Sequence, residues 1–174
     1  MSGNLPAARA LLDLGANPNI QGGHWGNALQ AAAVKGSEAI VRLLLDRGAH
    51  INAQGGYLGN ALHVVVVRGN EVLVRLLLDR GADINAPSGR YGALLAAVAK
   101  DNVTILCLLL DREANIHAEC GGYGEALLAA VAKDNVAIVR LLLDRGAIIA
   151  AEGSGYGNTL LESMTQGAEL LSAS

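Results

Sequence analysis

The apolar residues of this chain fall into short blocks that recur at a nearly constant spacing, with glycine-rich polar stretches between them. The string Leu-Leu-Leu-Asp-Arg occurs four times, and its copies start 33, 32 and 33 residues apart. The copies are Leu43–Arg47, Leu76–Arg80, Leu108–Arg112 and Leu141–Arg145. A second string, Gly-Asn-Ala-Leu or a close variant, alternates with the first, and its third copy at Gly92 lacks one residue, which explains the 32-residue step. A period of this length indicates stacked copies of one supersecondary unit.

Each copy predicts two short helices. The first begins after a polar cap residue and runs, for example, over Ala28–Lys35. An Asn cap suits this position because its side-chain oxygen accepts a free backbone N–H. The second helix runs, for example, over Glu38–Arg47, where apolar residues at i, i+1, i+4 and i+5 form one face. The predicted caps of the first helices are Asn27, Asn60, Glu125 and Asn158.

Glycine and aspartate mark the ends of these predicted helices. Arg47 falls in the last turn of the second helix, where a cation suits the helix dipole, and Gly48 follows as the residue that stops the helix. The same glycine recurs in most copies, and Glu113 replaces it once. Between the two helices, the breaking residues are Gly36, Gly69, Asp101 and Asp134.

Neither helix of a copy can bury its apolar face alone, so we expect the copies to stack into one solenoid that covers residues 1–174. The pattern divides this array into a half repeat, four full repeats and a truncated repeat. Their predicted bounds are 4–17 for the half repeat, 18–50, 51–83, 84–115 and 116–148 for the full repeats, and 149–174 for the truncated repeat. Because both end units are partial, we expect either a piece of a longer array or half-units that act as simple caps.

These units resemble the ankyrin-repeat family. The period, the paired helices, the Gly-Ala after the second helix and the segment Ile51-Asn52-Ala53 before a loop all match that family, and its Thr-Pro-Leu-His motif is represented by Asn60-Ala61-Leu62-His63. The glycine-rich variant of the motif is similar to ankyrin arrays of filamentous fungi. The resemblance implies an all-α solenoid of helix-turn-helix units with hairpin-like loop fingers. It also implies a protein or peptide partner on the concave side, and a loop-bonding role for His63.

The loop fingers contain most of the aromatic residues and supply the first candidates for partner binding. One aligned position holds Trp25, Leu58, Tyr91, Tyr123 and Tyr156, and the position before it holds His24, Tyr57, Arg90, Gly122 and Gly155. Trp, Tyr and Arg side chains dominate binding hot spots, so the aromatic members, His24 and Arg90 are candidate contacts. The constant register also suits rings that pack between adjacent fingers and shape the turn. Both interpretations stay open for the sequence.

A second candidate surface lies at the ends of the first helices. Stacking places one cation from each unit in what we call the cationic row: Lys35, Arg68, Lys100 and Lys133. The row could bind an acidic peptide or a carboxylate-bearing ligand. Alternatively, it is a solvated rim that suits a helix C-terminus, and neighbouring Asp101 and Asp134 reduce its charge.

Composition and charge narrow the classes of function. The net charge is -3, whereas nucleic-acid binding needs a concentrated basic face, so we expect no nucleic-acid partner. No segment has the ~20 apolar residues of a membrane span, and we expect no membrane partner. Cys107 and Cys120 are expected to be free thiols in a reducing compartment. We therefore expect a soluble, monomeric intracellular protein of the cytoplasm or nucleus.

No motif for catalysis, a metal or a cofactor stands out. The four histidines occupy different repeat positions, without metal-site spacing, and the glycine-rich strings lack the Lys-Ser/Thr of a phosphate loop. We therefore expect a binding scaffold without catalytic residues, metal or cofactor. Two alternatives stay open. One is a purely architectural segment of a longer receptor-like array. The other is a small-molecule-binding or enzymatic groove lined by Trp25, Tyr57, Tyr91 and Tyr123, with His24, Arg90 and Lys100 nearby.

Overall fold

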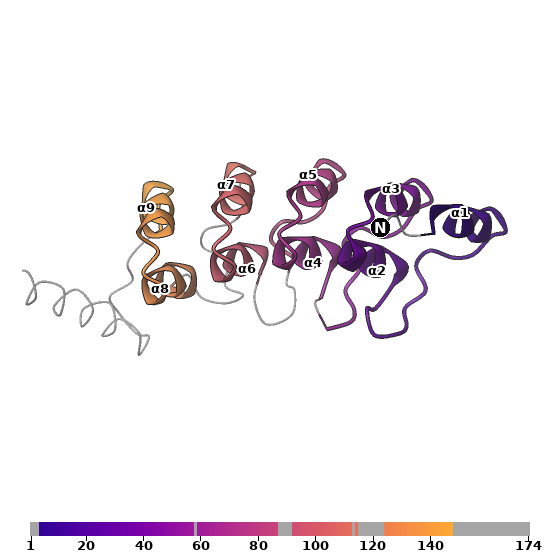
Figure 1. The fold of residues 1–174 in the computed structure, drawn as a ribbon, viewed down its shortest axis with the longest axis horizontal. Helices are drawn as coiled ribbons and strands as arrows, with labels where there is room; N and C mark the ends of the chain where they lie inside the picture. Colours follow the sequence, from indigo (N-terminus) through magenta and orange to yellow (C-terminus); the bar gives the residue numbers. More distant parts are fainter. Residues whose placement is uncertain (1–3, 58, 87–91, 113, 115–123, 148–174) are drawn as a thin grey trace, which may run out of the picture.

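The computed structural model describes residues 4–57, 59–86, 92–112, 114 and 124–147. Every regular element within these residues is an α-helix, as predicted for an all-α solenoid (Figure 1). The helices are α1 (Leu5–Asp13), α2 (Ala28–Lys35), α3 (Glu38–Asp46), α4 (Ala61–Val67), α5 (Glu71–Asp79), α6 (Ala93–Ala99), α7 (Val103–Asp111), α8 (Gly124–Ala132) and α9 (Val136–Asp144).

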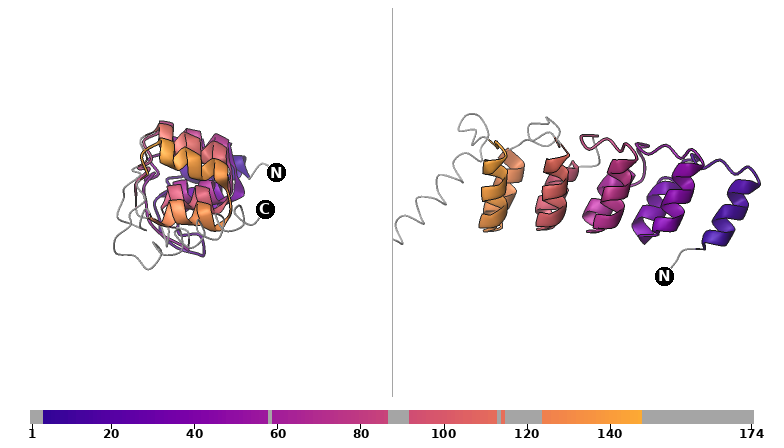
Figure 2. Two further views of the ribbon diagram at one scale, coloured as in Figure 1. Left: turned by 90° about the vertical axis from the view of Figure 1, so that its left-hand side faces the viewer. Right: turned by 90° about the horizontal axis from the view of Figure 1, so that it is seen from above.

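The helices form two layers that run along the length of the molecule. Figure 1 shows α2, α4, α6 and α8 in one layer and α1, α3, α5, α7 and α9 in the other. The end-on view in Figure 2 shows the helices of each layer almost superimposed. The loops before α2 and α4 extend beyond the layer of first helices (Figure 1). This arrangement exposes the loops and one side of the first helices on the same part of the surface.

Asparagine side chains begin most of the helices. Asn27 Oδ1 accepts a hydrogen bond from Gln30 N at 2.9 Å, and Asn60 Oδ1 accepts one from His63 N at 2.8 Å, so these predicted caps are confirmed. Second helices start in the same way at Asn70, Asn102 and Asn135. The predicted cap at Glu125 is wrong, because α8 already begins at Gly124. The predicted cap Asn158 lies outside the described residues.

Left-handed residues separate the helices, as the sequence predicts. The four breaking residues all have positive φ: +67° at Gly36, +69° at Gly69, and +54° at both Asp101 and Asp134. Glycine adopts this conformation without penalty, and aspartate tolerates it better than most residues. These turns fold each second helix back onto its first helix.

The second helix of the unit at 18–50 ends one residue earlier than predicted. Helix α3 ends at Asp46, and Arg47 is its C-cap, followed by Gly48 with φ +80°. The Arg47 guanidinium also forms an ion pair, in which its Nη2 lies 2.7 Å from Asp13 Oδ1 of the preceding unit. The same kind of ion pair recurs along the array, at 2.9 Å in each case: Arg80–Asp46, Arg112–Asp79 and Arg145–Asp111. Asp79 and Arg80 on α5 therefore link their unit to the units on either side.

The core is one continuous apolar cluster between the two layers. One register position of the second helices shows this most clearly, because its leucines are almost fully buried in every unit with a complete helix pair: Leu44, Leu77, Leu109 and Leu142. First helices contribute small residues such as Ala33 and Ala97, so the helices can approach closely. The equivalent residue in α1 is Leu11, which is 59% exposed. Helix α1 is thus a second helix without a first helix beside it among the described residues.

Candidate functional site

Each described finger is closed by a short backbone hydrogen bond. Gly22 N donates to Gly26 O at 2.6 Å, and Gly55 N donates to Gly59 O at 2.7 Å. The two fingers therefore have the same hairpin-like closure 33 residues apart, as the resemblance implied. Each one sits directly before a first helix and places its tip beside that helix.

Gln30 fixes one finger to the helix of the preceding unit. Its Nε2 donates to the carbonyl oxygens of Ala53, Gly55 and Gly59 at 3.4, 3.0 and 2.6 Å, and the side chain is only 1% exposed. Sequence reasoning missed Gln30 as a key residue and assigned loop bonding to the equivalent His63, which is also buried. The available signal was a glutamine at the histidine position of an otherwise alanine-rich helix.

Adjacent fingers also pack backbone against backbone. A Cβ added to Gly56 would lie 2.6 Å from the carbonyl carbon and oxygen of Trp25, which is too close for any side chain. Gly56 also has φ +61°, so glycine is required there on two grounds. The position of the Trp25 main chain is therefore set by the next finger.

The candidate side chains on the fingers remain accessible. The Trp25 ring is 38% exposed and lies edge-on to the His24 ring, with centroids 4.5 Å apart and an interplanar angle of 81°. Tyr57 on the next finger is 84% exposed. For Trp25, the main chain packs against the next finger while the residue stays 38% exposed, and binding of a partner by the ring stays a prediction. The candidates Arg90, Tyr91, Tyr123 and Tyr156 lie outside the described residues, as does Leu58.

A hollow of about 300 Å³ lies beside the first finger. It is lined by Ile20, Gly22, Gly23, His24, Trp25, Asn27, Ala28 and Ala31. Among these lining residues only His24 has an ionisable side chain, and the exposed Tyr57 does not contribute to the wall. Of the residues that the small-molecule alternative requires, His24 and Trp25 line this hollow, whereas Arg90, Tyr91 and Tyr123 lie outside the described residues.

The cationic row lies at the ends of the first helices, where the sequence placed it. Lys35 is the last residue of α2, Arg68 and Lys100 are the C-caps of α4 and α6, and Lys133 directly follows α8. All four are exposed. In the described part of the chain, no salt bridge includes Lys35, Arg68 or Lys100. These three charges are thus free to meet an acidic group.

Lys133 differs from the other members of the row because it is paired. Its Nζ donates to Asp101 Oδ2 at 2.5 Å, and Asn135 Nδ2 donates to Asp101 Oδ1 at 3.3 Å. The hydrogen bond from Lys133 lowers the pKa of Asp101, although some desolvation acts in the opposite direction. Asp101 is therefore ionised at neutral pH, and its pair with Lys133 is lost as the pH falls below the lowered pKa of this carboxyl. The predicted reduction of the row's charge by Asp101 is confirmed at this position.

The described residues contain no group of three His, Cys, Asp or Glu side chains placed to hold a metal ion. Cys107, on α7, is a free thiol. None of the described helices is both long enough and apolar enough to cross a membrane.

Part of the chain matches models of known protein families. Residues 29–72 match a model described as ankyrin repeats in many copies, and residues 60–89 match a model of the single ankyrin repeat. No curated protein matches the chain. Together the matched segments run from Leu29 of α2 through α5 and contain Gln30, Tyr57 and the finger closed between Gly55 and Gly59. The finger closed between Gly22 and Gly26 lies before them.

Proposed function

We propose that this chain, whose stacked helix pairs are ankyrin repeats, binds a protein or peptide on the finger face, defined as the loop fingers together with the cationic row. Ankyrin repeats are generally protein–protein interaction modules. The observation that carries the proposal is that the side chains of His24, Trp25 and Tyr57 are exposed while their loops are held in place. Gln30 bonds the finger that contains Tyr57, and that finger packs against the Trp25 backbone.

Rigid loops favour binding because little conformational entropy is lost when a partner arrives. The Gln30 side chain and the backbone contact between Trp25 and Gly56 hold two successive fingers before any partner is present. Trp and Tyr rings then offer a large contact area at a low cost in side-chain ordering. This surface supports a scaffold that recognises shape and does not turn over a substrate.

The cationic row supplies the charge preference of the proposal. Lys35, Arg68 and Lys100 are exposed cations on three successive first helices. Such a row attracts acidic side chains and increases the association rate at low salt. We therefore propose a partner segment that carries both an aromatic or apolar anchor for the fingers and acidic residues for the row. Arg90, Tyr91, Tyr123, Tyr156 and Lys133 extend the proposed contact surface along the array.

The test is a pull-down from a relevant lysate with three baits, read by quantitative mass spectrometry. One bait is the unchanged chain, and the second carries Trp25→Ala, Tyr57→Ala and Lys100→Ala. The third is a matched control with three changes on the second helices: Glu38→Ala, Arg42→Ala and Val72→Ala. Circular dichroism establishes that all three baits have the same helix content.

We expect a protein that is retained by the unchanged chain and the control and lost from the finger-face variant. Its retention should also fall as salt rises from about 50 to 300 mM, because exposed charge pairs are screened. A partner retained equally by all three baits would refute binding at the finger face. The same background from all three would favour the purely architectural interpretation of the array.

A further inference from the structure

One junction between units already holds a carboxylate of the chain itself. Asp101 lies between α6 and α7, and two residues of the next unit bind its side chain. Lys133 Nζ donates to Asp101 Oδ2 at 2.5 Å, and Asn135 Nδ2 donates to Asp101 Oδ1 at 3.3 Å. The Oδ1 atom of Asn135 meanwhile caps α9. A cation at the end of a first helix and the capping amide of the following second helix thus form a carboxylate site with two donors.

Glycine takes the place of Asp101 in the two preceding units, at Gly36 and Gly69. The three residues share a left-handed backbone, with φ of +54°, +67° and +69°. A Cβ added at Gly36 would lie 3.3 Å from Asn70 Nδ2, and one added at Gly69 would lie 3.5 Å from Asn102 Nδ2. Apart from the adjoining chain, no other heavy atom of the described residues lies within 4 Å of either added atom. Each glycine therefore leaves space for a carboxylate beside an asparagine amide.

The donors around these two glycines have the same residue types as the filled site, or nearly so. Asn70 and Asn102 cap α5 and α7 with their Oδ1 atoms, and neither Nδ2 atom donates a hydrogen bond within the described part of the chain. Arg68 and Lys100 occupy the register of Lys133, are exposed, and form no salt bridge with any described residue. We call Arg68 with Asn70 the first junction site, and Lys100 with Asn102 the second junction site.

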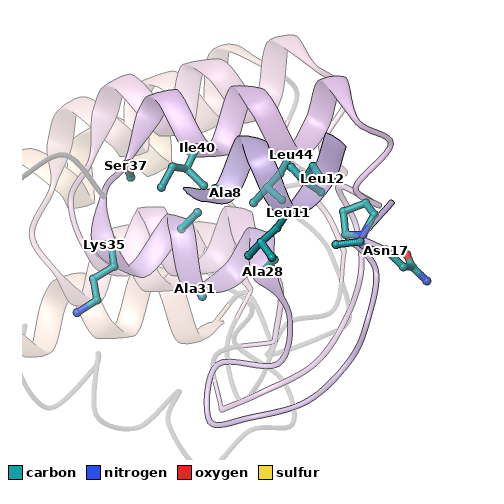
Figure 3. A pocket seen from close by; sticks show the side chains of 13 residues that line it. Ala8, Leu11, Leu12, Asn17, Ala28, Ala31, Lys35, Ser37, Ile40 and Leu44 are labelled. Carbon is teal, nitrogen blue, oxygen red and sulfur yellow. The ribbon is translucent and has the colours of Figure 1, made fainter. Parts of the chain in front are cut away.

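The first cation of the row lacks this arrangement. The residue two positions after Lys35 is Ser37, which has no amide to donate and makes no capping bond through its side chain. Figure 3 shows Lys35 extending from the end of α2 and Ser37 beside α3, where both line an apolar cleft of about 390 Å³. Paired donors for a carboxylate therefore begin with Arg68, one unit later.

We propose that the two junction sites each bind one acidic side chain of an extended partner segment, as the next unit binds Asp101. The first helices α4 and α6 pack against each other, and packed helices have axes about 8–10 Å apart. An extended chain rises about 3.3 Å per residue, so acidic residues three positions apart span the distance from one site to the next. The inference rests on the proposed function, because Arg68 and Lys100 belong to the cationic row. It adds the two amide donors and the number and spacing of the acidic residues.

The probe is the peptide Gly-Asp-Gly-Gly-Asp-Gly, acetylated and amidated at its ends and titrated into the isotope-labelled full chain. Nuclear magnetic resonance follows the side-chain amide signals of asparagine. We expect saturable shifts for Asn70 and Asn102 and none for Asn135, because Asp101 already occupies that amide. The peptide Gly-Gly-Asp-Asp-Gly-Gly has the same composition but cannot span both sites. It should bind about fivefold more weakly, which is the effect of losing one exposed charge pair.

Reciprocal changes at one register locate the sites. Gly69→Asp supplies a carboxylate internally, so the Asn102 signal should stop responding to the peptide. Asp101→Gly removes the internal carboxylate, so the Asn135 signal should begin to respond. Asp134→Gly makes the same replacement one unit later and is the matched control, which should leave Asn135 without a response. Glycine and aspartate both occur at this register with positive φ, and circular dichroism with unfolding midpoints establishes that each variant is folded.

The proposal would be overturned if neither Asn70 nor Asn102 responds to the peptide, or if Gly69→Asp leaves the response of Asn102 unchanged. Equal affinity for the peptide with adjacent aspartates would also contradict it. Glutarate tests a free dicarboxylate as the ligand, and glutarate that binds as tightly as the peptide would refute a partner segment.

A further bait in the lysate experiment, with Gly36→Asp and Gly69→Asp, separates this inference from the proposed function. A partner that this bait retains, and that the finger-face variant loses, would support binding at the finger face and contradict the junction sites. If the peptide shifts Asn70 and Asn102 while the finger-face variant loses no partner, the junction sites stand and the proposed function fails.

Discussion

The interior of the array and its N-terminal end share one sequence pattern but differ in burial. Leu77 in α5 and Leu11 in α1 occupy the same register position, yet Leu77 is fully buried and Leu11 is 59% exposed. Val41 in α3 is fully buried, whereas the equivalent Ala8 in α1 is only half-buried. The difference shows that the neighbouring helices, and not the local sequence, bury these positions. Stability in such an array is approximately a sum of unit and nearest-neighbour contributions.

The fingers show the same contrast. Gly56 lies against the Trp25 backbone, whereas Gly23, its equivalent one unit earlier, has nothing near an added Cβ. Both have positive φ, at +61° and +70°. Both positions therefore favour glycine because of their backbone conformation. Packing between the fingers adds a second, steric requirement for glycine at Gly56 only.

The largest expected difference is between Leu77→Ala and Leu11→Ala. Leu77→Ala removes a fully buried side chain and leaves a cavity, so we expect a loss of about 2–5 kcal/mol in the free energy of unfolding. Leu11→Ala, at an exposed position, should cost less than about 1 kcal/mol. Urea denaturation monitored by circular dichroism measures both. Similar losses at the two positions would show that the end of the array is packed like its interior.

The paired changes Gly56→Ala and Gly23→Ala separate strain from packing. Each introduces a side chain at positive φ, which costs about 1–2 kcal/mol. Only Gly56→Ala also forces atoms into the Trp25 backbone, and overpacking of this kind adds about 1–3 kcal/mol. The midpoint of thermal unfolding should therefore fall further for Gly56→Ala, and equal midpoints would argue against stacking of the two fingers.

Gln30→Ala tests the bond network between the unit at α2 and the next finger. It removes the Gln30 donor from the partly buried carbonyl of Gly55 and one of the two donors from the buried carbonyl of Gly59, so we expect a loss of about 1–3 kcal/mol in the free energy of unfolding. Gln30→His introduces the residue type that His63 has at the equivalent register. It should lose less, because an imidazole N–H can donate to the loop. Chemical denaturation compares the two variants, and a neutral Gln30→Ala would show that the network does not hold the finger.

The smallest expected effect belongs to the ion pairs between second helices. Arg80 and Asp46 are joined at 2.9 Å, but both side chains are partly exposed, at 37% and 61%. A double-mutant cycle with Arg80→Ala and Asp46→Ala should give a coupling of only about 0–1 kcal/mol, reduced further by salt. A coupling above about 2 kcal/mol would mean that these pairs, and not the apolar core, connect the units.

Much of the fold could be predicted from the sequence because the repeat makes each local signal redundant. Asn27 and Asn60 cap their helices, and Gly36 and Asp101 adopt the left-handed conformation, as their residue types predict. Glu125 was predicted as a cap by alignment alone, and α8 instead begins at the preceding glycine. The prediction failed because glutamate is not a preferred capping residue and the helix can start without it.

The candidate site was predictable in position but not in its contacts. The cationic row and the exposed His24, Trp25 and Tyr57 lie where the register placed them. The bonds of Gln30 and the pairing of Lys133 with Asp101 join residues of different units, 23 to 32 positions apart, and a helical pattern does not encode such geometry. The exposure of Leu11 on α1 likewise depends on which helices lie beside it, which no single repeat reveals.

Hydrogen exchange measured by mass spectrometry on the full chain tests most directly whether neighbouring helices determine stability. We predict that the backbone amides of α5, which packs beside α4 and α7, exchange at least about tenfold more slowly than those of α1 at the same pH and temperature. Protection that decreases from α5 through α3 to α1 would support nearest-neighbour stacking. Equal protection of α1 and α5 would contradict it, because a helix without buried residues should open more readily than a helix packed between two neighbours.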